Sequence, residues 1–377
     1  NSPATAKNPI VVGSIDSDSV LGKYVISSFS SFGPTDDGRI KPDLVAPGAH
    51  NSKVGITTEG ITSTGQNNDY IPKYGTSFAA PFVGGLVALM EEKWEQKNKN
   101  SFEPHLLPHT AKAILIHTAD DLGNPGPDYK YGWGLVNGKN AIKLITNSKL
   151  VKTSTSTNTT IKFPIIINDS FSASNLEKKY LLNLEVPTDL KLTLVWDDRG
   201  SPPGDFKSEV LLENDLDLLI SKGTDKKMSL VLDKNMPDAL AKEGSDTINN
   251  VEMIKSKLDK GVWTITVKGT GPFLKETGFT LIVSKIKPVI PSWIKNDAGW
   301  WAGDKITDND FVYGIQYLIN MGIMEIPSTP QGIDTEVNEI PSWIKNDAGR
   351  WANGLIDDNS FVQGIQYLIN MGKIKIQ

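Results

Sequence analysis

The segment that most restricts the fold is a stretch of small and apolar residues at positions 75–90 (GTSFAAPFVGGLVALM). Small residues dominate its first half, and larger apolar residues dominate its second half. A helix over 78–95 would carry such side chains nearly all round its axis, and a helix of that kind lies buried in a core. The sequence therefore predicts a central helix that other layers of structure cover.

Residues 1–148 alternate between short apolar runs, such as 10–13 (IVVG), and helical patterns. Besides the first helix, the apolar spacing predicts helices over 109–119 and 139–145. An alternation of short strands and helices is typical of an α/β fold. We therefore expect a partial α/β domain over 1–148.

Residues 149–287 have a different sequence pattern. Turns rich in Thr, Ser and Asn separate segments in which apolar and polar residues alternate, as in 190–196 (LKLTLVW) and 263–267 (WTITV). Five or more such strands without a long helical period favour an antiparallel β-sandwich. The sequence predicts a separate β-sandwich domain here.

The C-terminal residues contain an internal repeat with an offset of 50, because 290–326 and 340–376 are identical at 27 of 37 positions. Each copy ends in an apolar helical pattern followed by glycine, the usual residue after a helix. We expect two small helical repeats, at 288–327 and 340–377, joined by a linker at 328–339.

Composition excludes several classes of protein. The 377 residues carry a net charge of −5, which does not favour a protein that binds nucleic acid through phosphate contacts. The longest apolar run, 82–90, is too short to span a membrane. Without cysteine, the chain has no disulfide, no thiolate metal site and no cysteine nucleophile.

Ser77 is the candidate catalytic residue, because it lies where the central helix begins. There the backbone N–H and the positive end of the helix dipole would face an oxyanion formed by attack of its Oγ. Small neighbours such as Gly75 allow a substrate backbone to approach, and we expect Pro81 in the first helical turn. The alternative is that Ser77 only caps the helix, as serine often does.

Five sequence blocks favour the catalytic interpretation. They are 29–34 (FSSFGP), 41–48 (KPDLVAPG), 75–81 (GTSFAAP), 111–119 (AKAILIHTA) and 131–137 (YGWGLVN). In this order they closely resemble the subtilisin-like serine proteases, or subtilases.

The resemblance to subtilases implies the site residues and the reaction. It implies a serine endopeptidase with Ser77 as nucleophile, with Pro3, Ala4, Gly75 and Thr76 binding a peptide or protein substrate, and with no organic cofactor. It also implies a secreted or cell-surface protein, which the sequons at Asn158 and Asn168 fit.

The histidines depart from the subtilase pattern, in which Asp, His-Gly-Thr and an oxyanion Asn precede the serine. None of the four is followed by Gly-Thr. His117 fits a hydrogen-bonded core residue, and capping or exposure explains His105 and His109 better than catalysis does. Asp43 at a strand end fits a structural role.

Two explanations of these departures are open. The sequence is a C-terminal fragment whose upstream part holds the Asp, the His and the oxyanion Asn, or it is a complete pseudo-enzyme. An α/β sheet that begins at Ile10 would lack its central strands, which favours the fragment. We therefore expect these 377 residues alone to be inactive.

The β-rich region looks like the jelly-roll domain that follows the catalytic unit in many large subtilases, and is similar in architecture to the P-domain. Four carboxylates there, Asp197, Asp198, Asp215 and Asp217, can supply oxygen ligands to Ca²⁺. The alternative is that they form turns and solvated strand ends.

The tryptophans of the repeats form either a small core or a carbohydrate-stacking surface, and regular spacing favours the core. They are Trp293, Trp300, Trp301, Trp343 and Trp351. The repeats resemble those at the C-termini of archaeal secreted proteins, which suggests attachment to the cell envelope. The competing function is therefore a non-catalytic envelope or adhesion protein on a degenerate subtilase scaffold.

Overall fold

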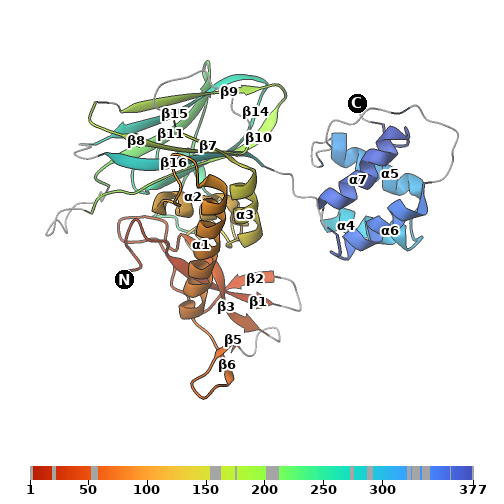
Figure 1. Ribbon diagram of the computed structural model, residues 1–377, viewed down its shortest axis with the longest axis horizontal. Helices are drawn as coiled ribbons and strands as arrows, with labels where there is room; N and C mark the ends of the chain where they lie inside the picture. The colour runs from red at the N-terminus through yellow and green to blue at the C-terminus, as the bar shows by residue number, and fades with distance from the viewer. Residues whose placement is uncertain are drawn as a thin grey trace. The chain divides into compact units, whose positions relative to one another are not determined.

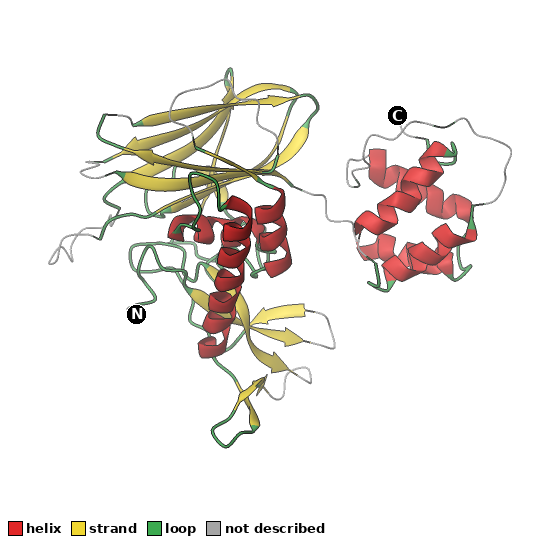
Figure 2. Ribbon diagram, in the orientation of Figure 1, coloured by secondary structure: helices red, strands yellow, loops and turns green. Residues whose placement is uncertain are grey.

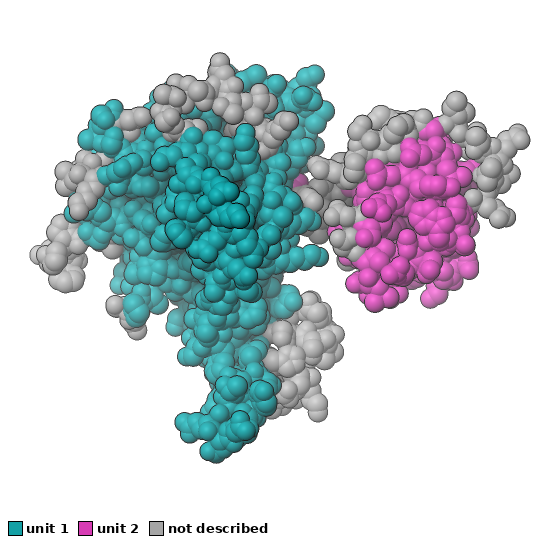
Figure 3. Space-filling model, viewed as in Figure 1, with its two compact units in different colours: residues 1–285 teal, residues 286–377 magenta. Residues whose placement is uncertain are grey.

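The computed structural model divides into two compact units, residues 1–285 and 286–377 (Figure 3). The described residues are 3–18, 23–51, 58–152, 163–174, 176–200, 212–271, 276–286, 292–320, 324, 332, 340–356 and 358–375. No helix among them is both long and apolar enough to cross a membrane.

The first part of the 1–285 unit has a four-stranded sheet with the order β2-β1-β3-β4 (Figure 1). Its two central strands, β1 and β3, run parallel. A hairpin, β5–β6, leads into the first helix. The strands are β1 (Val12–Asp18), β2 (Lys23–Ile26), β3 (Leu44–Asn51), β4 (Thr58–Glu59), β5 (Ile61–Thr64) and β6 (Tyr70–Lys73).

Three helices follow in this part of the chain, and each of the three predicted helices is confirmed. They are α1 (Thr76–Asn98), α2 (Pro108–Thr118) and α3 (Gly138–Asn147). Helix α3 begins after Asn137, whose side chain accepts a hydrogen bond from the Asn140 N–H at 2.9 Å, the usual N-cap arrangement.

The expectation that the central helix is buried all round was wrong. One face of α1 packs against β1, β3 and α3 through Val83, Leu86 and Met90. The opposite face is exposed, with Phe82 at 54% and Leu89 at 58% exposure. The apolar character of both faces was predicted correctly, but within the described residues only one face has a partner.

The rest of the unit contains two five-stranded sheets, with orders β14-β10-β16-β8-β7 and β13-β12-β11-β15-β9 (Figure 2). All neighbours pair antiparallel except β7 and β8. The strands are β7 (Lys149–Val151), β8 (Ile165–Phe171), β9 (Glu177–Leu184), β10 (Thr188–Trp196), β11 (Asp215–Lys222), β12 (Asp225–Val231), β13 (Lys242–Gly244), β14 (Val251–Leu258), β15 (Gly261–Thr270) and β16 (Thr277–Lys285).

The two five-stranded sheets share one core, because side chains of alternating positions from both of them form a single buried cluster around Trp196 and Trp263. The other face of the β10–β16 sheet is also buried, since α2 packs on it and Thr110 bonds to Thr280 at 2.7 Å. Asn168 lies on this covered face and is 5% exposed, so its sequon is not accessible in the folded chain. Asn158 lies outside the described residues.

In the 286–377 unit, the described residues form four helices, α4 (Ser292–Ala302), α5 (Asp308–Asn320), α6 (Ser342–Ala352) and α7 (Asp358–Asn370). Trp301 stacks on Phe311 with ring centroids 4.0 Å apart, and Trp351 stacks on Phe361 at 4.1 Å. Each of these two indoles also donates to an aspartate at the start of the following helix. This part of the repeat is a core.

The tryptophans divide between two roles. Trp301 and Trp351 are buried, whereas Trp300 and Trp343 are 48% and 46% exposed. The Trp293 side chain lies outside the described residues. The core interpretation therefore holds for one tryptophan of each copy and fails for Trp300 and Trp343.

Candidate functional site

Ser77 lies in the first turn of α1, and strand β3 holds the start of this turn in place. The Gly75 N–H donates to the Gly48 carbonyl at 2.9 Å, so the residue before the helix is tied to the strand. Gly75 has φ +142°, which favours glycine, and a Cβ at Gly48 would meet the Gly75 carbonyl at 2.7 Å. The two glycines let the backbone of the turn approach the sheet.

The capping alternative for Ser77 was wrong. The residue before α1 is Gly75, and Ser77 is the second residue of the helix, with no capping hydrogen bond from a side chain. Its side chain is exposed, and neither its Oγ nor its N–H has a hydrogen-bond partner among the described residues. An exposed hydroxyl beside a free helix N–H suits attack on a carbonyl and stabilisation of the resulting oxyanion.

Pro81 lies later than expected, because it is the sixth residue of α1 and not part of the first turn. Its missing N–H would otherwise bond to the Ser77 carbonyl, four residues earlier. Helix α1 continues to Asn98 despite this interruption.

A pocket of about 520 Å³ lies beside the turn. Ala4 and Thr76, two of the four residues expected to bind substrate, line it. Phe29 and Phe32 form part of its apolar lining. Of the other two expected residues, Gly75 precedes Thr76 directly, and Pro3 precedes Ala4, so the four lie at the pocket or next to a residue that lines it.

The three histidines whose side chains are described form hydrogen bonds with groups other than Ser77. His117 is buried between Thr193 and Ser284, at 2.8 and 2.7 Å, which confirms its assignment to the core. Burial, with a smaller effect of Lys191 and Lys255, holds the pKa of His117 well below its ordinary value. The side chain of His50 lies outside the described residues.

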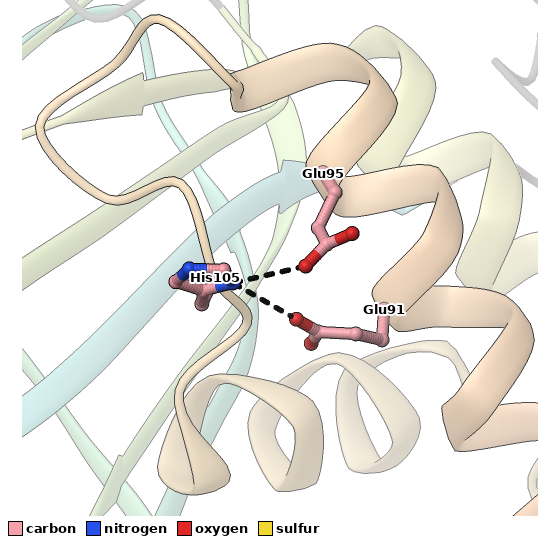
Figure 4. Close-up of side chains that lie close together, drawn as sticks. All are labelled: Glu91, Glu95 and His105. Atoms are coloured by element: carbon pink, nitrogen blue, oxygen red, sulfur yellow. Dashed lines mark hydrogen bonds and ion pairs between the residues drawn. The ribbon is translucent and has the colours of Figure 1, made fainter.

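The other two histidines differ from each other. His109 is buried, with its Nδ1 2.9 Å from Asp197 Oδ2, so the expectation of capping or exposure was wrong for it. His105 is exposed, as expected, and lies next to Glu91 and Glu95 on α1 (Figure 4). The sequence did not indicate this contact, because a connection of nine residues separates α1 from α2.

Asp43 forms a buried group with two lysines. Its carboxylate lies 2.7 Å from Lys41 Nζ and 2.9 Å from Lys112 Nζ, and it accepts the Val11 N–H at 2.8 Å. Burial opposes ionisation of Asp43, but Lys112 and Lys41 outweigh it and lower its pKa. These contacts fix the start of β3, which is the strand that holds the Ser77 turn.

The four carboxylates considered for Ca²⁺ do not form one group. Asp197 is paired with His109. Asp198 is paired with Lys7 and accepts the N–H groups of Glu213 and Asn214, each at 2.9 Å.

Two further acidic groups that the sequence analysis did not single out, Asp246 and Glu252, lie near Asp217. Burial first, and then Asp217, Asp246 and Asp198, raise the pKa of Asp215 to about 7. Burial and Asp246 likewise raise the pKa of Glu252 well above its ordinary value. One oxygen of Asp215 and one of Glu252 are buried without a hydrogen-bond partner among the described residues. The segment 249–252 (NNVE) carried no metal-binding spacing that would have pointed to Glu252.

The first part of the chain is similar to a known protein family. Residues 1–134 match the subtilase family model. The subtilase-like segment, as we call these residues, contains the Ser77 turn and the residues that line the pocket. Homology to serine proteases supports a protease function.

Two curated relatives illustrate the extent of the likeness. The chain is 27% identical to the serine protease/ABC transporter B family protein tagA of Dictyostelium discoideum over 70% of this chain and 16% of that protein. It is 30% identical to the serine protease AprX of Bacillus subtilis over 37% of this chain and 31% of AprX. The chain thus spans less than a third of either relative.

Among solved structures, the CspB protease of Clostridium perfringens is 33% identical, with a TM-score of 0.32. The match covers 39% of this chain and 29% of that protein.

Proposed function

We propose that Ser77 is the nucleophile of a serine endopeptidase. The observation that carries the proposal is an exposed serine with an unpaired Oγ and N–H at the start of α1, inside a segment that matches the subtilase family. The pocket lined by Ala4 and Thr76 next to it would hold the peptide on one side of the bond to be cleaved.

The reaction would be acyl transfer. A base takes the proton from Ser77 Oγ, and the oxygen attacks the carbonyl carbon of a peptide bond. The Ser77 N–H and the end of the α1 dipole stabilise the oxyanion, and water then hydrolyses the acyl-enzyme. No organic cofactor takes part in these steps.

We propose that the base is a histidine outside this sequence, together with its aspartate and a second oxyanion donor, an asparagine. The described side chains of His105, His109 and His117 are bound elsewhere, which supports this view. The exposed apolar face of α1, which includes Phe82 and Leu89, offers a surface that further polypeptide would cover.

The test uses the 377-residue chain and the longer product of the same reading frame. The chain alone should not cleave casein, because loss of the base lowers turnover in subtilisin on the order of a million-fold. The longer product should cleave it and bind a fluorophosphonate probe at Ser77. Ser77→Ala should abolish both, whereas Ser174→Ala, at an exposed serine in the β-rich part, should change neither.

Casein cleavage by the 377-residue chain that is lost in Ser77→Ala would overturn the fragment proposal and leave the nucleophile in place. A longer product that neither cleaves casein nor reacts with the probe would overturn the protease itself.

The second candidate is a non-catalytic envelope or adhesion protein, favoured by exposed aromatic side chains on the 286–377 unit. Tyr313 is 71% exposed, and Tyr317 and Trp300 are about half exposed. Such rings stack on sugars, so we propose that this unit attaches a secreted or cell-surface protein to envelope polysaccharide. Co-sedimentation with purified cell walls should fall in Trp300→Ala and stay unchanged in Phe32→Ala, whose exposed ring lies in the other unit.

We also propose a structural Ca²⁺ at Asp215 and Asp217, the two members of the set first considered that form no ion pair among the described residues. The buried Oδ1 of Asp215, which has no hydrogen-bond partner among the described residues, supports it, because Ca²⁺ prefers carboxylate oxygens and would neutralise the repulsion between Asp215 and Asp217. At a hundred times its dissociation constant, Ca²⁺ should stabilise the fold by about 2.7 kcal/mol. Calorimetric melting with and without a chelator measures this gain, and an unchanged midpoint contradicts the site.

A further inference from the structure

A mixed group of one histidine and two glutamates lies on the exposed side of the junction between α1 and α2. Glu91 and Glu95 are one turn apart on α1, and His105 lies in the connection to α2 (Figure 4). His105 Nδ1 is 2.9 Å from Glu95 Oε1 and 3.7 Å from Glu91 Oε1. One ligand atom from each residue lies within 4.8 Å of the other two.

The backbone holds this arrangement in place from both sides of His105. On one side, the Leu106 N–H donates to both oxygens of Glu91, at 3.1 and 3.4 Å. On the other side, the buried Trp94 donates its indole N–H to the Glu103 carbonyl at 3.0 Å. Little conformational freedom would therefore be lost when the three side chains bind a common partner.

An ion pair alone accounts poorly for the group. Two glutamates four residues apart on a helix repel each other. Within the described residues, no lysine or arginine forms an ion pair with Glu91 or Glu95, and the side chain that contacts both is His105. His105 is 73% exposed, and an exposed pair of this kind contributes little to stability. A dication would compensate both carboxylates at once.

The donor atoms select the kind of cation. One imidazole nitrogen and two carboxylate oxygens are a usual ligand set for Zn²⁺, which takes four ligands and keeps a solvent molecule where the protein supplies three. Ca²⁺ and Mg²⁺ prefer oxygen ligands throughout, so the imidazole disfavours them.

We propose that Glu91, Glu95 and His105 form a binding site for a divalent transition metal of the Zn²⁺ type. The metal would join the last turns of α1 to the connection that leads into α2. The three residues are separate from the Ser77 turn and from the residues that line the pocket, so the metal would take no part in the proposed protease reaction.

The test titrates the full 377-residue chain with Zn²⁺ by calorimetry and with Co²⁺ by visible absorption, which reports coordination directly. The wild-type chain should bind one Zn²⁺ through this group and give the Co²⁺ absorption of a low-coordinate site. His105→Ala and Glu95→Gln should each weaken binding by at least about tenfold. Glu92→Gln is the matched control, because Glu92 is exposed on the same helix and contacts Gln96 instead.

Circular dichroism checks that the variants fold, and Glu95→Gln remains informative if His105→Ala does not. The proposal is overturned if the wild-type chain shows neither a heat of binding nor a Co²⁺ band, or if folded Glu95→Gln binds as tightly as Glu92→Gln. Ser77→Ala should bind Zn²⁺ normally, so this outcome is independent of the protease proposal.

Discussion

Asp43 and Glu252 are both buried carboxylates in the 1–285 unit, at 3% and 1% exposure, yet the charged groups around them have opposite signs. Asp43 lies between two lysine ammonium groups, at 2.7 and 2.9 Å. Glu252 lies among other acids, and its two hydrogen-bond donors, the Leu218 N–H and the Ser229 hydroxyl, reach only one of its oxygens. The pKa of Asp43 is lowered, and that of Glu252 is raised.

The difference separates two uses of buried charge. A carboxylate with neighbouring cations joins the elements around it, here the start of β3, α2 and the N-terminal segment. A group of carboxylates without cations destabilises the fold unless protons or a metal ion neutralise it. Two lysines of this chain neutralise Asp43. The acidic group around Glu252 needs protons or a metal ion from solution.

The largest expected effect comes from removing the charge of Asp43. In Asp43→Asn, two buried ammonium groups lose their counter-ion, and the free energy of unfolding should fall by about 3–5 kcal/mol. Glu252→Gln is the matched variant in the absence of Ca²⁺. Its amide oxygen keeps the acceptor for Leu218 and Ser229, so the loss should stay below about 1 kcal/mol. Urea unfolding measures both, and equal losses would contradict the comparison.

The pH dependence of stability should have opposite signs at the two sites. Asp215, which shares the acidic neighbours Asp217 and Asp246 with Glu252, has a folded-state pKa of about 7 against an ordinary 3.8, so the folded state holds more protons between these values. Its contribution is complete at low pH and is lost as the pH rises through about 7. Asp43 has a lowered pKa, so its contribution is lost only as the pH falls through the acid range.

Asp215 is partly exposed, which reduces its expected effect to about 1–2 kcal/mol between pH 4 and 8. Urea unfolding in the presence of a chelator should show this decline, and Asp215→Asn should flatten it. A decline of the same size in the variant would assign the pH dependence to other groups.

The sequence predicted much of the first part of the fold for identifiable reasons. Periodicity located α1, α2 and α3, and the small residues before α1 indicated the turn that carries Ser77. These features are local, because they depend on residues within one or two turns of each other. Whether both faces of α1 are buried depends on which other elements pack against them, and local periodicity carries no information about those elements.

The charged groups were less predictable because their partners are far apart in the chain. Asp197 is a candidate Ca²⁺ ligand by its sequence context, but it pairs with His109, 88 residues away. Glu252 reaches the Leu218 N–H across 34 residues, through strands that belong to different sheets. Spacing in one strand placed Asp215 and Asp217 on one face, yet it could not show which acids approach them from another strand.

The smallest effect is expected from Lys41, and it tests which lysine stabilises Asp43. The Coulombic attraction of Lys112 is the largest single effect that lowers the Asp43 pKa, and burial lowers the pKa of Lys41 to about 8. Lys41→Met keeps the buried methylene groups and leaves Lys112 to neutralise Asp43, so the loss at pH 7 should be about 1 kcal/mol or less. Lys112→Met should cost clearly more, because Lys112 is only 2% exposed and also donates to the Lys7 carbonyl at 2.9 Å.

The two variants should also differ at high pH. The unfolded chain binds a proton at Lys41 more readily than the folded chain does, so wild-type stability gains from this lysine as the pH rises from about 8 toward 10.5. Lys41→Met should lose that gain, and urea midpoints at pH 7 and pH 10 measure it. Equal losses in Lys41→Met and Lys112→Met at pH 7 would mean that Asp43 depends on both cations alike.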